Sequence, residues 1–334
     1  MKLSAAEIRS VASGVLEMKE ETGGVRLYRM TKVQRAWYDA KNTPVNRAHS
    51  MAGVTLDFHT DSAGLTLACS GLWINPQYHC TFDLLVDGER WTFFRIHEAE
   101  AQMDRAGETA FRHVFRLPEG EKRVTLYFPA YKMRIDEVSL DDGAVFRPHQ
   151  HKLNWLVFGD SITEGREPTH SDSPYINRVA RRLDAQVYNQ AISGEMFRVG
   201  KIMPGSYPAC DFVTVAYGTN DFRKQEAELL LPTVAVFFRE LVAEFPDVPI
   251  VYFLPVWRSD KDRITRGRTL EEVIPLLRKE AERWPQITVV DCWDFIPHEE
   301  GYFFDARLHP NDEGAACQAE GVYRAIARRL GIDV

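Results

Sequence analysis

The segment LNWLVFGDSITEG, residues 153–165, decides the fold of the second half of the chain. Residues 153–158 form an apolar run of the kind that makes a strand buried on both faces. Gly159 permits a tight exit from this strand. Ser161 then falls near the start of a helix, where free backbone N–H groups and the helix dipole favour negative charge. From this segment alone, a helix N-cap and a nucleophile are equally good interpretations of Ser161.

Strands and helices alternate downstream of this segment. The sequence predicts further strands at 186–190, 212–217, 250–254 and 287–290, and helices at 174–183, 226–244, 270–283 and 313–330. Such alternation requires βαβ crossovers and therefore predicts a parallel sheet in a three-layer α/β domain.

The first half of the chain has a different rhythm of short, alternating strands separated by turns. Strands are predicted at 25–30, 54–58, 65–69, 82–86, 91–96, 111–117, 123–128 and 134–140. Asp87-Gly88 predicts a hairpin because both residues tolerate positive φ. An antiparallel, jelly-roll-like β-sandwich follows from this pattern. Its core is expected to contain the aromatic residues Trp91, Phe93, Phe94, Phe111 and Phe115.

The polar, proline-containing connector at 147–152 places the boundary between the two halves. We expect a sandwich domain at 1–150 and a catalytic domain at 151–334. The length of 334 residues agrees with two domains.

Composition excludes several classes of protein. The net charge of −7 provides no basic field for nucleic acid or an anionic membrane. Five widely spaced cysteines without a C-x-x-C pair form neither a disulfide framework nor a zinc-finger pattern. Glu7 and Arg9 interrupt the apolar stretch that a signal peptide would need, so we expect a cytoplasmic protein.

Polar residues follow three more of the predicted strands, and in an open parallel sheet such strand ends form the functional edge. Gly194 follows the strand at 186–190, and Asn220 follows the strand at 212–217. His309 precedes the last helix, with Asp305 nearby. Taken singly, each is better interpreted as a turn residue or a structural histidine. Their occurrence together, in order, favours a catalytic site.

This conjunction resembles the GDSL/SGNH hydrolase superfamily over residues 153–332. The matching blocks are Gly159-Asp160-Ser161-Ile162, then Gly194, then Gly218-Thr219-Asn220-Asp221, then Asp305 with His309-Pro310. The resemblance implies a flavodoxin-like α/β/α fold, Ser161 as the nucleophile and His309 as its base. It also implies an oxyanion hole formed by the backbone N–H groups of Ser161 and Gly194 and the side chain of Asn220. No cofactor or metal is implied.

One position departs from the family pattern. The family's aspartate lies three residues before the histidine, where this chain has Ala306. Asp305, four residues before, is the best candidate for the third member of the triad, as though the loop carried one extra residue. The alternative is that His309 leans on a backbone carbonyl, as in dyad members of the superfamily.

The substrate class follows from the two-domain arrangement, which is similar to that of family-two carbohydrate esterases. It implies a serine esterase for short acyl, foremost acetyl, esters of sugars or glycosides. Asp160, Asp221, Trp257 and Arg258 are predicted to contact this small-molecule substrate, with Trp257 as a stacking face; core packing is the alternative for Trp257. Acyl transfer by the same residues and a non-catalytic carbohydrate-binding protein are the competing functions. Whether the chain forms a homo-oligomer is left open.

Overall fold

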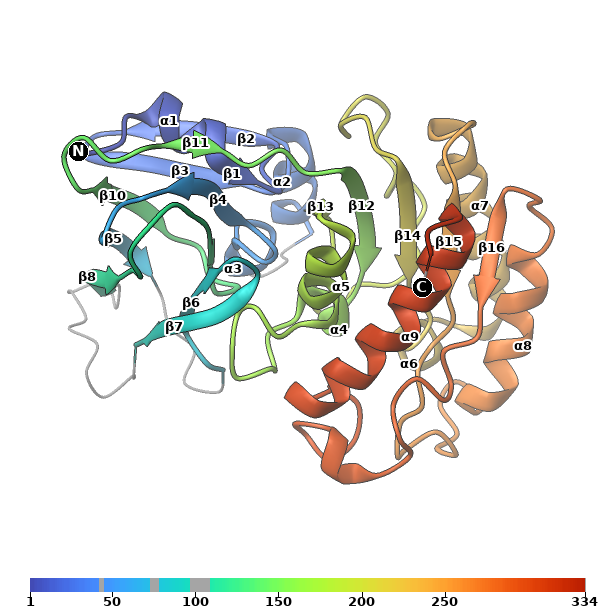
Figure 1. Cartoon of the computed structure of the whole chain (residues 1–334). Coiled ribbons are helices and arrows are strands. Elements are labelled where there is room, and N and C mark those ends of the chain that lie inside the picture. Colours follow the sequence, from blue (N-terminus) through green and yellow to red (C-terminus); the bar gives the residue numbers. More distant parts are fainter. Residues whose placement is uncertain (42–44, 73–77, 97–108, 334) are drawn as a thin grey trace. The chain divides into compact units, whose positions relative to one another are not determined.

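The computed structural model describes residues 1–41, 45–72, 78–96 and 109–333 (Figure 1). The chain divides into two compact units. The first is Met1–Lys152 together with the short segments Thr169–Asp172 and Gln186–Asn189. The second comprises the rest of the described chain from Leu153 onward.

The first unit contains two antiparallel sheets. One has the strand order β2 (Glu17–Glu21), β3 (Gly24–Tyr28), β10 (Arg134–Leu140), β5 (Gly64–Leu72) and β8 (Thr109–Arg116). The other has the order β1 (Ala12–Ser13), β4 (Thr55–Thr60), β9 (Lys122–Tyr127), β6 (Thr81–Val86) and β7 (Glu89–Arg95), with β11 (Arg147–Pro148) paired to β4. Apart from the hairpins β2–β3 and β6–β7, neighbouring strands are distant in sequence, as in a jelly roll, so the predicted sandwich is confirmed.

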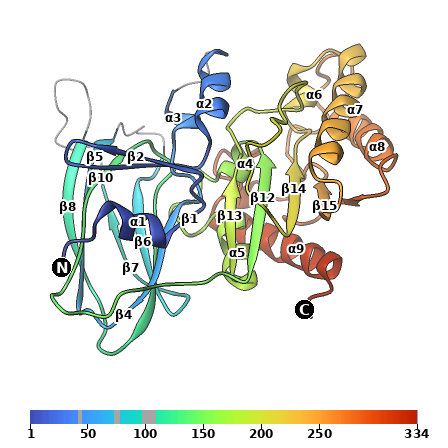
Figure 2. The same cartoon turned by 90° about the horizontal axis from the view of Figure 1, so that it is seen from above.

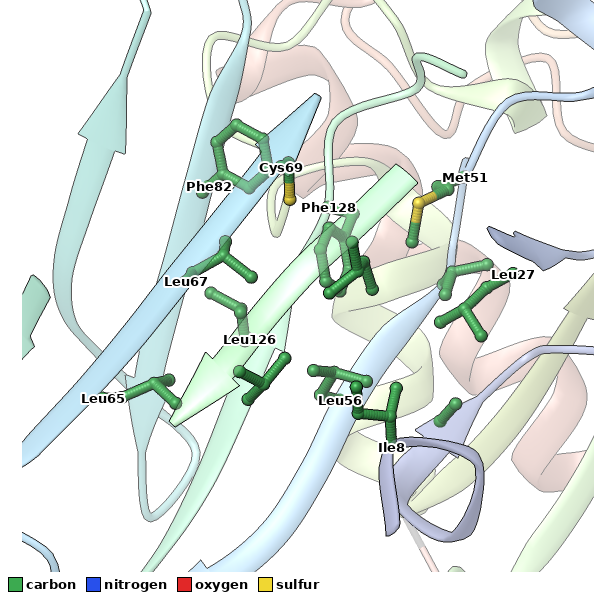
Figure 3. Close-up of a cluster of buried hydrophobic side chains, with 14 of the residues drawn as sticks. Ile8, Leu27, Met51, Leu56, Leu65, Leu67, Cys69, Phe82, Leu126 and Phe128 are labelled. Carbon is green, nitrogen blue, oxygen red and sulfur yellow. The ribbon is translucent and has the colours of Figure 1, made fainter. Parts of the chain in front are cut away.

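The core of the sandwich lies between the inward faces of these sheets (Figure 3). Leu65, Leu67 and Cys69 alternate with more exposed residues along β5 and are fully buried. Leu56 of β4 and Leu126 of β9 are buried in the same cluster from the other sheet. Along β5 the period of two in the sequence therefore matches the alternation of buried and more exposed side chains.

Two of the aromatic residues expected in this core lie outside it. Trp91 and Phe93 are 53% and 46% exposed. Trp91 and Phe93 are two residues apart on the edge strand β7, so their side chains lie on the same, outward face. Phe94, between these alternate positions, packs against the core. The neighbouring hairpin is as predicted, because Asp87 and Gly88 both have positive φ, 50° and 89°.

Short helices in the first unit were not predicted. Helix α1 (Ala5–Val11) begins at a capping box formed by Ser4 and Glu7. Helix α2 (Lys32–Asp39) begins at a second one, formed by Thr31 and Gln34. Each pair satisfies backbone N–H groups that the first turn leaves free. A third short helix is α3 (Val45–Ala48).

A five-stranded parallel sheet has the order β13 (Ala185–Asn189), β12 (Leu153–Gly159), β14 (Phe212–Ala216), β15 (Ile250–Phe253) and β16 (Ile287–Val290). Helices α5 (Tyr175–Leu183) and α9 (Asp312–Leu330) cover one face (Figure 2). Helices α7 (Ala227–Glu244) and α8 (Leu270–Ala281) cover the other. The shorter helical segments are α4 (Ser161–Glu164), α6 (Asp221–Lys224) and η2 (Glu300–Tyr302).

When the strands are numbered by their order along the chain, their order across the sheet is 2-1-3-4-5. This order is flavodoxin-like and confirms the predicted fold class. The first strand, β12, has its sequence neighbour β13 on one side and β14 on the other. Strand order reverses there, and the carboxyl end of β12 is therefore where such a sheet offers a crevice for a ligand. Among the described residues, no helix combines the length and apolar character needed to cross a bilayer.

Candidate active site

Ser161 lies at the carboxyl end of β12, at this reversal point. It is the first residue of α4, and its residue exposure is 6%. Gly159 ends the strand, and a Cβ there would lie 2.3 Å from the Thr163 hydroxyl oxygen. Glycine is therefore needed for the chain to turn directly from strand into helix. The N-cap is Asp160, whose side chain accepts a hydrogen bond of 3.0 Å from the Ile162 N–H. The hydroxyl of Ser161 is therefore not the cap of this helix.

His309 faces this serine from the loop between η2 and α9. Its Nε2 lies 2.9 Å from Ser161 Oγ, although 148 residues separate the two. The loop is closed by a bridge between Phe303 and Pro310 and by a 2.7 Å bond from the Phe304 N–H to the His309 carbonyl. These backbone contacts close the loop around His309.

Asp305 contacts the other side of the imidazole. His309 Nδ1 lies 2.9 Å from Asp305 Oδ2. Oδ1 of the same carboxylate accepts the backbone N–H groups of Arg307, Leu308 and His309 at 3.1, 2.7 and 3.1 Å. One carboxylate therefore both shapes the loop and orients the histidine.

The extra residue of this loop is accommodated by a left-handed turn. Ala306, which occupies the position where the family carries its aspartate, has φ of +54°. This conformation, uncommon for a residue with a side chain, lets Asp305 fold back over the backbone of residues 307–309. The spacing of four residues instead of three thus leaves the carboxylate within reach of the imidazole.

The protonation of the pair follows from these contacts. Burial raises the pKa of Asp305, but hydrogen bonds from His309 and from backbone N–H groups outweigh it and hold that pKa well below its ordinary value. The ionised carboxylate only accepts, so Nδ1 of His309 carries the hydrogen and Nε2 is left to accept from Ser161. Burial lowers the pKa of His309, but the Asp305 hydrogen bond and the charges of Glu167, Asp305 and Asp160 outweigh it and raise the pKa overall.

Asn220 connects the loop of Ser161 with the loop of Gly194. The Asn220 amide donates to the Glu195 carbonyl at 3.0 Å and to Asp160 Oδ2 at 3.4 Å. It therefore touches both the residue before Ser161 and the residue after Gly194, and the three blocks meet at this amide. Gly194 has φ of +81°, and its carbonyl accepts from Lys224 Nζ at 2.9 Å.

A buried glutamate that was not predicted fixes the Gly194 loop. Glu164, at the end of α4, is 2% exposed. Its Oε2 accepts the Ser193 N–H at 2.9 Å and also the Ser193 hydroxyl, and Arg166 Nε lies 3.3 Å away. The only sequence signal for this role was its place in the same one-turn helix as Ser161.

Two of the four predicted substrate contacts are buried carboxyls with structural partners. Asp160 caps α4, and burial raises its pKa to about 6. Asp221 is 0% exposed, accepts the Phe197 N–H at 3.0 Å, and has a pKa raised to about 8 by burial. Its side chain does not reach the surface, so the contact of Asp221 with substrate stays a prediction that its burial does not favour.

The other two predicted contacts, Trp257 and Arg258, are also buried. Arg258 is 0% exposed, forms an ion pair with Asp260 and donates to the Thr219 hydroxyl at 3.0 Å. These contacts hold Arg258 against the loop before Asn220, and its contact with substrate stays a prediction that its burial does not favour. Trp257 is 8% exposed and stacks on His298 with ring centroids 5.1 Å apart, so packing describes it better than a stacking face.

One group of possible metal ligands lies in the first unit. Asp83, His170 and Asp172 bring their ligand atoms close enough to share an ion. However, His170 Nδ1 lies 2.6 Å from Asp83, and Arg90 pairs with both aspartates. These atoms are engaged with one another, and none belongs to the serine site.

A serine, an imidazole and a carboxylate in hydrogen-bonded series on an open α/β sheet define a serine hydrolase type of site. Residues 157–317 match the model of the GDSL-like lipase/acylhydrolase family. The second unit therefore carries a domain of that family, and the protein is an ester hydrolase of the SGNH type.

Solved structures share the fold over both units. A salicylyl-acyltransferase from a tetracycline biosynthetic pathway has a TM-score of 0.75 at 23% identity, covering 96% of this chain and 94% of that chain. A putative GDSL-like lipase from Bacteroides ovatus has a TM-score of 0.73 at 18% identity, covering 100% and 98%. An acetyl xylan esterase from the rumen bacterium Butyrivibrio proteoclasticus has a TM-score of 0.62 at 15% identity, covering 95% and 99%. No curated protein shows significant sequence similarity to the chain.

Proposed function

We propose that the protein hydrolyses short-chain acyl esters, foremost acetyl esters of carbohydrates, through an acyl-serine intermediate. The observation that carries the proposal is the 2.9 Å contact between Ser161 Oγ and His309 Nε2, extended by the 2.9 Å contact to Asp305. This series places a proton acceptor on the serine hydroxyl and an ionised carboxylate behind it.

In the proposed mechanism, Ser161 Oγ attacks the ester carbonyl carbon while Nε2 of His309 takes the hydroxyl proton. The Nε2–H then delivers this proton to the departing alkoxide, and the acyl group remains on the serine. Water repeats the sequence and releases the acid and the free enzyme. Asp305 stabilises the imidazolium that exists between the two proton transfers.

The negative charge that develops on the ester carbonyl oxygen needs hydrogen-bond donors other than His309. The backbone N–H groups of Ser161 and Gly194 and the amide of Asn220 are the proposed donors. Support comes from the meeting of their three loops and from the start of α4 at Ser161, where the helix dipole favours an anion. Each such donor is typically worth about 3–4 kcal/mol in the transition state.

Carbohydrate acetates are proposed as the substrate class because of the two-unit architecture. The acetyl xylan esterase that shares this fold over nearly its whole length is named for an acetylated polysaccharide. Acyl transfer to an alcohol is the second candidate, because the structure with a TM-score of 0.75 is named an acyltransferase. The same serine and histidine would serve both, since an acceptor hydroxyl only takes the place of water.

The test measures acetate release from acetylated xylosides, glucosides and sialosides, with the Ser161→Ala protein as the blank. We expect turnover by the wild-type protein and none above background by the variant, with an unchanged melting temperature. Adding an acceptor alcohol and analysing the products separates hydrolysis from transfer. Labelling by a fluorophosphonate tests for an activated serine. No labelling and no turnover would favour the non-catalytic binding protein and refute the proposal.

A further inference from the structure

Glu167 is a buried acid next to the serine and histidine that the mechanism above does not use. It lies in the segment between α4 and α5, and its side chain is 4% exposed. Its Oε1 is 3.8 Å from His309 Nε2, the same nitrogen that faces Ser161 Oγ. The carboxyl therefore borders the place where bonds are made and broken.

The carboxyl of Glu167 has a charged neighbour in the imidazole of His309, at 3.8 Å, but no hydrogen-bond donor from another of the described residues. Apart from its own backbone N–H, no group of the described residues donates a hydrogen bond to it. Other acids around the site are satisfied, as Glu164 is by Ser193 and Asp305 by three backbone N–H groups. Burial of a carboxyl without donors is costly, and here it raises the pKa of Glu167 to about 7. A ligand that brings a donor would remove this cost.

The position relative to His309 shows which part of the ligand brings that donor. Nε2 must lie within hydrogen-bond reach of the departing oxygen when it returns the proton. Glu167, adjacent to Nε2, is therefore on the alcohol side of the ester, whereas Gly194 and Asn220 are assigned to the carbonyl oxygen. A hydroxyl on the carbon next to the ester-bearing carbon would lie between the departing oxygen and Glu167.

We propose that Glu167 accepts a hydrogen bond from this neighbouring hydroxyl and so selects esters of vicinal diols, such as partly acylated sugars. The inference rests on the proposed esterase function and specifies its alcohol. Above its pKa of about 7 the carboxyl of Glu167 is ionised and can only accept. A hydrogen bond to a charged acceptor is roughly twice as strong as a neutral one, so at such a pH Glu167 supplies discrimination between a free hydroxyl and a blocked one.

The test compares two acetates that differ only in this donor, 2-hydroxyethyl acetate and 2-methoxyethyl acetate. For the wild-type protein we expect kcat/KM to favour the hydroxy ester about tenfold or more, as a hydrogen bond to a charged group allows. Glu167→Ala should reduce the ratio to near one. Glu167→Gln, which keeps a neutral acceptor, should give an intermediate ratio. Glu300→Ala, an exposed glutamate on η2, is the matched control and should keep the wild-type ratio.

The outcomes separate this inference from the esterase proposal. A wild-type ratio near one, or the wild-type ratio in both Glu167 variants, would overturn the role of Glu167 while leaving the esterase intact. If Glu167→Ala does not fold, the ratio of Glu167→Gln decides alone. Absence of wild-type turnover on either ester and on p-nitrophenyl acetate would overturn the esterase proposal, and this inference with it. A carboxyl acting only on the imidazolium charge would slow both esters equally and leave the ratio unchanged.

Discussion

Replacing Asp305 by Asn tests the geometry of the site most directly. The amide keeps an oxygen for the three backbone N–H groups of residues 307–309, so the loop is expected to stay folded. The other oxygen, Oδ2, becomes an NH₂ group facing His309 Nδ1. Two donors cannot face each other, so the hydrogen of the imidazole moves to Nε2, which can then no longer accept the Ser161 proton.

The size of the loss follows from how well water can replace the carboxylate. Where the orienting aspartate is fully buried, this change costs about 10⁴-fold in kcat. Here the side chains of His309 and Asp305 are 23% and 26% exposed, so water can partly restore the useful tautomer. We therefore expect a loss of about 10³-fold, or roughly 4 kcal/mol at 1.36 kcal/mol per factor of ten.

The assay is hydrolysis of p-nitrophenyl acetate at a pH above the acid limb, with a thermal melt of each protein. Asp294→Asn is the matched control, because Asp294 lies 3.1 Å from Nε2 of His298 with the same spacing of four residues but outside the serine site. It should keep wild-type activity. If Asp305→Asn retained more than about a tenth of the activity while folded, the carboxylate would not orient the base, and a backbone carbonyl would be the better candidate.

Three further predictions concern the same site. Asn220→Ala should lower kcat about 10²- to 10³-fold with a small change in KM, because its amide is assigned to the transition-state oxyanion; a loss below about threefold would remove Asn220 from that role. The wild-type kcat/KM should fall as pH is lowered through the pKa of His309, since only the neutral imidazole accepts a proton, and the midpoint should lie above the ordinary 6.5. Glu167→Gln removes one of the negative charges facing the imidazole, so a pH titration of the variant should show this midpoint moved to lower pH. A midpoint at or below 6.5 in the wild type, or a midpoint at higher pH in the variant than in the wild type, would contradict the electrostatic reasoning.

The sequence pattern was sufficient where the residues of a single strand or helix show by themselves whether that element is buried. The apolar run before Gly159 predicted β12, and the order of strands and helices after it predicted the parallel sheet. Because polar residues at the ends of parallel strands share one edge, Ser161 and His309 could be expected to meet before any coordinates were known. The structure places them 2.9 Å apart.

Local pattern failed where burial depends on a partner distant in sequence. Arg258 and Trp257 follow β15 at the same edge, yet Asp260 and His298 cover them, so their position at a strand end did not make them substrate contacts. The sequence also offered no way to separate exposed Phe93 from buried Phe115, because both lie on alternating strands and only the packing of the two sheets decides which face is covered.

By itself, the sequence determined the fold class and the four blocks of the site, because backbone periodicity and the chemistry of glycine, serine and histidine act over a few residues. Tertiary structure alone decided where the carboxylates around the imidazole of His309 lie. A left-handed Ala306 brings Asp305 to the imidazole despite the longer spacing, and chain packing leaves Glu167 buried beside Nε2 without a donor. The charge and the hydrogen bonds of a carboxyl group depend on every group around it in space. These groups come together only when the chain folds and the loops meet.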